Sequence, residues 1–362
     1  MLFGSPSSGD GFANSAFTRA AAADLRAEQR LRHKIGDLFL PDEARLSDRA
    51  RSAAHVVLAG IVAAAEAELR REAARLLAAR GARALADQIF GGEPVLGRLA
   101  GTGLLRDPEL MDELIARVEL DLLSQALPPF VPEPERLDLM AVLTGSPDDE
   151  VATAAVALVG AENRRRAANG GATIARGELS AELHQRLLWW VAAVIREQSP
   201  DLDGMADRDR ALTEATLRSL AAHDEGDRPE AAAARLAEAI DPRPDELADL
   251  LVATVNEGRL TLFAALVARA ATVEYEQVRR LMIDPGADLL PLLLRVVGVE
   301  RTVIARIGVA LAEADVRRDL EQLADKIEWV EAHDPETART ALAPLALHRD
   351  FRAAVRALSQ EP

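Results

Sequence analysis

The sequence predicts an all-α protein. Hydrophobic residues make up 49% of the chain but aromatic residues only 3%, and Ala and Leu, which are strong helix formers, supply most of the apolar content. The β-branched and aromatic runs that strands require are missing, apart from short pieces such as His55 to Leu58 that lie within helical periodicity. Helix starts recur at intervals of roughly 35 to 40 residues, the length of a HEAT-like helix pair. We therefore expect HEAT-like helical repeats, an α-solenoid, followed by a helical C-terminal bundle.

The chain has 362 residues, which exceeds the usual size of one compact core, so more than one structural part is expected. The first residues are rich in Gly and Ser, which is typical of disorder. A polar loop, HDEGDRP at 223–229, marks a second change of composition. The expected parts are a disordered tail at 1–16, a helix at 17–45, HEAT-like repeats at 46–225 and a C-terminal helical domain at 226–362.

Helix boundaries can be predicted from capping residues. Ser47 is a candidate N-cap for a helical run that ends at Gly81, a good residue to follow a helix. The run is too long for one ordinary helix, so a break near Ala63 to Glu66 is expected, although no Pro forces it there.

The same signals recur further along the chain. Asp107-Pro108 opens a helix to about Leu127, because Asp caps and Pro suits the first helical position. The stretch 146–149 repeats this before 151–168, and Ser180 caps the next helix. The C-terminal helices expected are 244–258, 260–270, 275–283, 288–297, about 300–331, and a final pair from 334 to about 358.

The helix ELHQRLLWWVAAVIRE, Glu182 to Glu197, holds two of the three tryptophans. Projected at about 100° per residue, Trp190 falls on an apolar face, while Trp189 falls on nearly the opposite face beside Arg186 and Arg196. Two interpretations remain open for Trp189. Either neighbouring helices bury it, or it binds a partner together with the arginines, because Trp and Arg are enriched at interface hot spots. The residues that share the apolar face with Trp190 are Leu183, Leu187, Val191 and Val194.

The densest basic cluster is Arg164-Arg165-Arg166, in the last turn of a predicted helix. There the positive charges interact favourably with the helix dipole. The alternative is contact with an acidic partner or a phosphate, for which arginine is suited. The candidate partner-binding residues are Arg186, Trp189, Arg196, Arg164, Arg165 and Arg166.

No pattern for catalysis, cofactor binding or metal binding is present. There is no cysteine, and no two of the six histidines are within one helical turn of each other in sequence. The HExxH, ExxH, Walker A and G-x-S-x-G patterns are missing. Asp201-Leu202-Asp203-Gly204 resembles part of a calcium loop, but Leu212 stands where an EF-hand needs its glutamate. We therefore expect no catalytic residues, no cofactor and no metal.

The net charge of −16, from 59 acidic and 43 basic residues, disfavours nucleic acid as a partner. We expect no signal peptide and no membrane span, because the apolar runs Ala53–Ala65 and Leu187–Ile195 are shorter than the roughly 20 residues required. A cytoplasmic location is expected from the lack of cysteine. The helix at 17–45 is a candidate for pairing two copies of the chain.

Four successive sequence blocks carry a family resemblance: LSDRARSAAHVVLAGIVAAAEAELRREAARLLA, PVLGRLAGTGLLRDPELMDELI, the Trp-Trp helix and EGRLTLFAALVARAATVEYEQVRRLMIDPGADLLPLLLRVVGV. Together they resemble an uncharacterised bacterial family with HEAT-like helices, the domain of unknown function 2336, over about Leu46 to Ala310. The resemblance implies a stacked all-α fold and a regulatory or scaffolding role. It implies no catalytic residues.

The expected function is a non-enzymatic scaffold or regulatory adaptor that binds another protein, since helical repeats present extended surfaces. Two alternatives remain open. One is a DNA-processing enzyme of the HEAT-like glycosylase type, which needs an arginine-lined groove with an open Trp and a carboxylate. The other is a small-ligand sensor in the C-terminal bundle, which needs a closed apolar pocket with a few polar groups.

Overall fold

A computed structural model describes residues 45–128, 138–169, 178–198, 204–286 and 289–332, with isolated positions between 339 and 358. All regular structure in these residues is helical, and they contain no strand. The predicted all-α class is confirmed. The predicted tail at 1–16 and the helix at 17–45, apart from Arg45, lie outside the described residues, as does most of the final helix pair.

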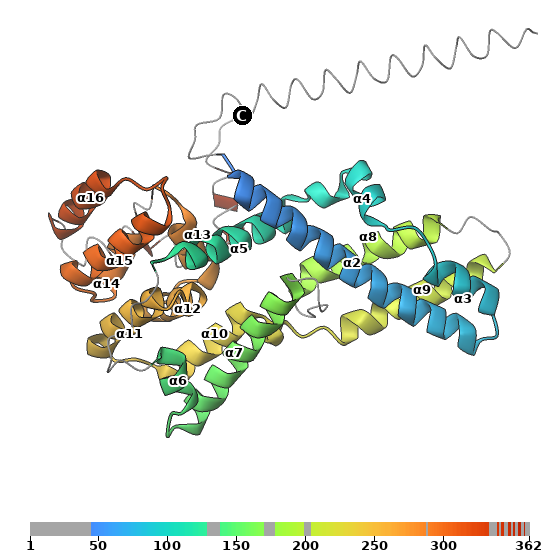
Figure 1. Ribbon diagram of the computed structural model, residues 1–362, viewed down its shortest axis with the longest axis horizontal. Coiled ribbons are helices and arrows are strands. Elements are labelled where there is room, and N and C mark those ends of the chain that lie inside the picture. The colour runs from blue at the N-terminus through green and yellow to red at the C-terminus, as the bar shows by residue number, and fades with distance from the viewer. Residues whose placement is uncertain are drawn as a thin grey trace, which may run out of the picture. The chain divides into compact units, whose positions relative to one another are not determined.

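The chain divides into two units, Met1–Ser47 and Asp48–Pro362, and all the helices below belong to the second. Within it, two groups of helices form, and α5 (Pro108–Ala126) contacts both (Figure 1). The first group is α2 (Asp48–Ala79), α3 (Arg83–Phe90), α4 (Leu96–Thr102), α8 (Ala181–Glu197) and α9 (Met205–Ala221). The second is α6 (Leu139–Thr144), α7 (Asp149–Asn169), α10 (Pro229–Ile240), α11 (Pro244–Asn256), α12 (Leu260–Ala271), α13 (Tyr275–Ile283), α14 (Leu289–Val296), α15 (Arg301–Ala314) and α16 (Leu320–Ala332). Two short 3₁₀ helices, η2 (Leu104–Arg106) and η3 (Glu225–Asp227), precede α5 and α10.

Helix α2 is continuous over 32 residues, so the predicted break near Ala63 to Glu66 is wrong. The segment is rich in Ala, Leu, Glu and Arg, which are all strong helix formers, and it contains no Pro to interrupt it. Packing against α3, α5, α8 and α9 stabilises it as one helix. Figure 1 shows α2 as the long blue helix with α8 and α9 beside it.

Among the described residues, α2 is the one helix long and apolar enough to cross a membrane by length and composition. The sequence predicted no membrane span because the run Ala53–Ala65 is short. Helix α2 is continuous and therefore longer than that run. A buried core helix passes the same test, and α2 buries Leu69, Ala73 and Leu77.

Arg70 fastens α2 to the neighbouring segments. Its guanidinium is buried and donates hydrogen bonds to the carbonyl oxygens of Ile89 and Glu93, both at 2.6 Å, and to the side chain of Gln198 at 2.7 Å. An ion pair with Glu66 at 2.7 Å balances its charge. This arginine therefore ties the end of α3 and the end of α8 to the middle of α2.

The core of the second group is organised around α12. All of its residues from Leu262 to Ala268 are apolar and buried, as expected for a core helix. The helix contacts α10, α11, α13 and α14, and Phe263 at its centre is fully buried. Gly258, just before α12, has a φ of +63°, and a side chain there would lie 3.0 Å from the carbonyl oxygen of Ser124, so glycine is needed where α5 meets this corner.

The caps predicted at Asp107, within 146–149 and at Ser180 are confirmed. The side chain of Asp107 accepts a hydrogen bond from the Leu110 amide at 2.9 Å, and that of Ser180 accepts one from the Leu183 amide at 3.4 Å. Asp148 does the same at the start of α7. Local capping therefore determines where these helices begin.

The single helix predicted over about 300–331 is instead two, α15 and α16. Asp315 ends the first, because its carboxylate accepts hydrogen bonds from the Arg317 backbone and guanidinium. Asp319 starts the second by accepting from the Glu321 amide at 2.8 Å. Asp side chains that bond to nearby backbone amides compete with continued helix.

The hydrophobic core runs across the boundary predicted at 225/226. Helices α7 and α10 lie side by side (Figure 1), and Ala155 and Leu158 of α7 belong to the same buried cluster as Ala233 and Leu236 of α10. The segment 223–229 is thus a polar loop that connects helices next to a shared core.

Removing the central aromatic side chain should destabilise the protein strongly. For Phe263→Ala we expect a loss of about 3–5 kcal/mol in the free energy of unfolding, because the substitution leaves a cavity in α12. The control Phe90→Ala, at a site 65% exposed, should change stability by no more than about 0.5 kcal/mol. Urea unfolding followed by circular dichroism measures both, and equal losses would contradict the buried position of Phe263.

Candidate functional site

The exposed face of α8 carries Trp189, whose side chain is 38% exposed. On the opposite face Leu187, Leu188 and Ile195 are buried against α2 and α9. Trp190 was predicted in the core, but it is only partly buried. The buried face is rotated toward Leu188 and Ile195 because α8 packs on several helices rather than on one.

Arg186, one turn before Trp189, is held by two carboxylates at the start of α5. Its guanidinium donates to Asp107 at 2.7 Å and to Glu109 at 2.8 Å, and these bonds raise the pKa of Arg186. On the same helix Arg196 pairs with Asp209 of α9 at 3.0 Å. Arg186 therefore lies in a fixed position beside an exposed tryptophan, and Arg196 links α8 to α9.

The three consecutive arginines of α7 have different surroundings. Arg164 is exposed and lies 3.6 Å from Asp227. Arg166 is exposed and pairs with Glu162 at 3.1 Å. Arg165 is buried, and its side chain points inward, where interior carboxylates compensate its charge. The structure brings together Arg186 and Trp189, and separately Arg165 and Arg166.

Arg165 belongs to a continuous series of alternating acidic and basic side chains, which we call the Arg–Glu chain. Its four carboxylates and four guanidinium groups come from α5, α7, α10, α13 and the residues next to α8 and α10. Most of the eight side chains are at least 87% shielded from solvent, and Glu276 at one end is 32% exposed. In order, the chain is Glu276, Arg279, Glu113, Arg228, Glu230, Arg165, Glu178 and Arg117.

The contacts within the Arg–Glu chain are close. Arg165 binds both oxygens of Glu230, at 2.7 and 2.8 Å, and this two-bond geometry is the strongest that an arginine offers a carboxylate. The other contacts are Arg279–Glu276, Arg279–Glu113 at 2.7 Å, Arg228–Glu113 at 2.8 Å, Arg228–Glu230 at 3.7 Å, Arg165–Glu178 at 3.2 Å and Arg117–Glu178 at 2.5 Å.

The pKa values follow from burial and from the neighbouring charges. Burial alone would raise the pKa of Glu230, but Arg165 and Arg228 hold it well below its usual range. Burial would likewise lower the pKa of Arg165, but Glu230 and Glu178 raise it. Glu276 differs, because burial raises its pKa to about 7 despite the opposing effect of Arg279. Glu230 and Arg165 therefore keep their charges at neutral pH, whereas Glu276 titrates near it.

The Arg–Glu chain was missed in the sequence because its members are distant from one another along the polypeptide. One local signal exists. Glu113, Arg117 and Asp121 are spaced four residues apart on α5, between the buried Leu114 and Val118. A charged stripe that interrupts an apolar face predicts buried ion pairs, although it does not identify the partners.

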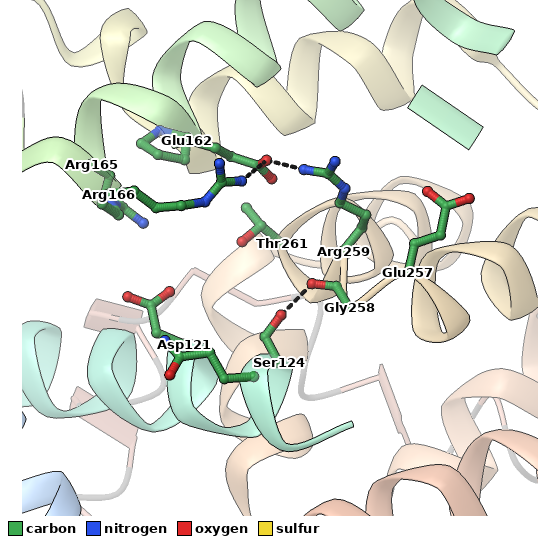
Figure 2. A pocket seen from close by; sticks show the side chains of 11 residues that line it. Asp121, Ser124, Glu162, Arg165, Arg166, Glu257, Gly258, Arg259 and Thr261 are labelled. Atoms are coloured by element: carbon green, nitrogen blue, oxygen red, sulfur yellow. Dashed lines mark hydrogen bonds and ion pairs between the residues drawn. The ribbon is translucent and has the colours of Figure 1, made fainter. Parts of the chain in front are cut away.

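A cavity of about 360 Å³ lies beside Arg165, where α5, α7 and the corner between α11 and α12 meet. In Figure 2, Ser124 donates to the carbonyl oxygen of Gly258, and Glu162 joins Arg166 and Arg259. The wall is polar rather than apolar, and its residues come from separate segments of the sequence. The charged members are Asp121, Glu162, Arg165, Arg166, Glu257 and Arg259.

Two histidines that are distant in sequence stack in the structure. The rings of His184 and His223 lie 4.1 Å apart and nearly parallel, and the Nε2 of His223 is 3.1 Å from the carbonyl oxygen of Leu179. Burial, together with His223, lowers the pKa of His184 to about 4. His184 is therefore a neutral packing residue at pH 7.

No group of three or more His, Cys, Asp or Glu side chains suited to a metal ion occurs among the residues that the structure describes. The polar features with defined geometry are thus the Trp189–Arg186 surface, the Arg–Glu chain and the cavity at its side.

The raised pKa of Glu276 predicts a pH-dependent stability. Its pKa rises from 4.5 to about 7 on folding, so the folded state binds more protons in that window and the free energy of unfolding falls as pH increases through it. Glu276→Gln removes this titration. Relative to the unsubstituted protein, the variant should gain roughly 1–2 kcal/mol between about pH 5 and pH 8, a figure reduced for solvent screening.

Urea unfolding at a series of pH values measures this difference. Glu197→Gln is the control, because Arg98 lowers the pKa of Glu197 and its titration lies below the tested window. Its stability should run parallel to that of the unsubstituted protein. A Glu276→Gln profile that also runs parallel would contradict the raised pKa.

Comparison with known proteins gives one match. The model of an uncharacterised protein family conserved in bacteria, DUF2336, matches residues 131–343, so the family is confirmed, although the match begins later than the resemblance from Leu46 predicts. No curated protein and no solved structure matches the chain. The matched region includes α6 to α16 and most of the Arg–Glu chain. The chain belongs to this uncharacterised bacterial family.

Proposed function

We propose that this protein is a non-enzymatic scaffold or regulatory adaptor that binds another protein through the exposed face of α8. The observation that carries the proposal is Trp189, 38% exposed on a helix whose opposite face is fully buried. Large aromatic residues on rigid supports lose little conformational freedom on binding, and Trp and Arg dominate interface hot spots.

The surroundings of Trp189 favour protein binding. Arg186 is fixed by Asp107 and Glu109, so little ordering is required of it when a partner binds. Leu104, 39% exposed in η2, adds an apolar residue next to the α5 start. An exposed aromatic residue bordered by paired charges has the composition of an interface with a polar rim.

The same charges give less support to a DNA-processing enzyme. Such an enzyme would need arginines free to meet phosphate. Arg164, Arg166, Arg186 and Arg196 each have a carboxylate within 4 Å, which reduces the positive potential they could offer. The protein-binding proposal therefore ranks first.

We also propose that the helices are arranged as HEAT-like pairs and that the protein works in the cytoplasm. Consecutive helices pack together in the pairs α2–α3, α6–α7, α8–α9, α11–α12 and α15–α16, which supports HEAT-like helix pairs as the units that present the binding face. The cysteine-free composition supports work in the bacterial cytoplasm.

Affinity purification of the tagged full chain from its native cells tests this function. Trp189→Ala should lose a specific partner, because truncating a hot-spot residue costs about 2 kcal/mol or more, roughly thirtyfold in Kd. Trp329→Ala is the matched control, since Trp329 is another exposed tryptophan, 49% exposed on α16. Both variants should keep the melting temperature of the original protein.

A partner lost from Trp189→Ala and retained by Trp329→Ala supports the α8 face as the binding surface. Identical partners for all three proteins, quantified by mass spectrometry, would contradict it.

A further inference from the structure

The cavity beside Arg165 is built from three directions. Asp121 and Ser124 of α5 form one side, Glu162 and Arg166 of α7 face them, and the α11–α12 corner closes the third (Figure 2). Packed helices on all three sides therefore hold the shape of the cavity. At about 360 Å³ it has room for on the order of a dozen water molecules, and it is near the lower limit of roughly 300–1,000 Å³ for ligand sites. This size suits a small metabolite.

Asp121 is the exceptional residue of the wall. Its carboxylate makes no hydrogen bond or ion pair within the described part of the chain, although Arg165 and Arg117 are near enough to act on its charge. Those two arginines already bind Glu178 and Glu230. Burial raises the pKa of Asp121 despite the opposing effect of these two guanidinium groups.

The other charges of the wall do not supply the missing partner. Glu162 pairs with both Arg166 and Arg259, so those guanidinium groups are engaged. Glu257 accepts a hydrogen bond from the Leu139 amide at 2.6 Å with one oxygen, and burial raises its pKa. Each guanidinium group of the wall is thus paired with a carboxylate of the protein, whereas Asp121 and Glu257 form no ion pair with a described residue, which favours a cation.

We propose that this cavity binds a small aliphatic amine, with the ammonium group paired to the carboxylate of Asp121. A buried carboxylate is costly without a positive partner, and a bound ammonium supplies that charge together with three N–H donors. A second carboxylate in the wall, that of Glu257, favours a diamine over a monoamine. This site is separate from the α8 surface and does not depend on the protein-binding role.

Isothermal titration calorimetry on the purified full chain tests the proposal with three probes of four carbons each. Putrescine, a diamine, should show saturable binding at one site. Butylamine, with one ammonium group, should bind more weakly. Succinate, a dianion of similar length, should not bind.

Asp121→Asn should weaken putrescine binding by about tenfold or more, because it removes the charge while preserving the shape of the side chain. Asp112→Asn is the matched control, the same substitution on the same helix at an exposed aspartate that pairs with Arg280 outside the cavity. It should bind putrescine as the original protein does. Thr261→Lys places an ammonium group in the cavity wall and should abolish binding in a folded protein, so it decides the question if Asp121→Asn does not fold.

Three results would overturn the proposal: putrescine fails to bind saturably, Asp121→Asn or Thr261→Lys binds it as tightly as Asp112→Asn, or succinate binds in preference to the amines.

Discussion

Guanidinium and carboxylate groups can occupy the interior of a helical protein only where each meets an opposite charge. The Arg–Glu chain satisfies this requirement with side chains from α5, α7, α10 and α13 and from the segment before α8. Displacing any of these elements by one turn would leave a buried charge without its partner, at a cost of about 3–5 kcal/mol. Hydrophobic packing allows many helix arrangements, whereas this network allows few. The Arg–Glu chain therefore contributes more to the uniqueness of the fold than to its net stability.

Both candidate sites depend on the helices that the Arg–Glu chain positions. Glu178 precedes the cap of α8, so the pairing of Glu178 with Arg117 and Arg165 fixes the start of the helix that carries Trp189. The cavity has Arg165 in its wall and Asp121 one turn beyond Arg117 on α5. An interior ion network thus links an exposed surface to a polar cavity. The Glu276 end, with a pKa of about 7, makes the network sensitive to neutral pH.

The helix caps could be predicted from the sequence, because they depend on neighbouring residues. The contacts between helices could not. Asp107, Asp148 and Ser180 act within their own helices, so the predicted starts of α5, α7 and α8 were confirmed. The continuity of α2 and the partial exposure of Trp190 depend on neighbouring helices, and both were predicted incorrectly. Arg165 was recognised as notable, but its interior partners could not be identified, because Glu178 and Glu230 lie 13 and 65 residues away. Nothing in the sequence marked Asp121 as a site residue, apart from its four-residue spacing from Arg117 on α5.

A double-mutant cycle on Arg165 and Glu230 measures the central constraint most directly. Arg165→Met and Glu230→Leu should each destabilise the protein by about 3–5 kcal/mol, because each leaves a charge buried without its main partner. The double variant should lose less than the sum of the two single losses, by a coupling energy of about 2–3 kcal/mol. Single losses that simply add, with coupling below about 0.5 kcal/mol, would contradict the claim that the Arg–Glu chain determines how these helices pack.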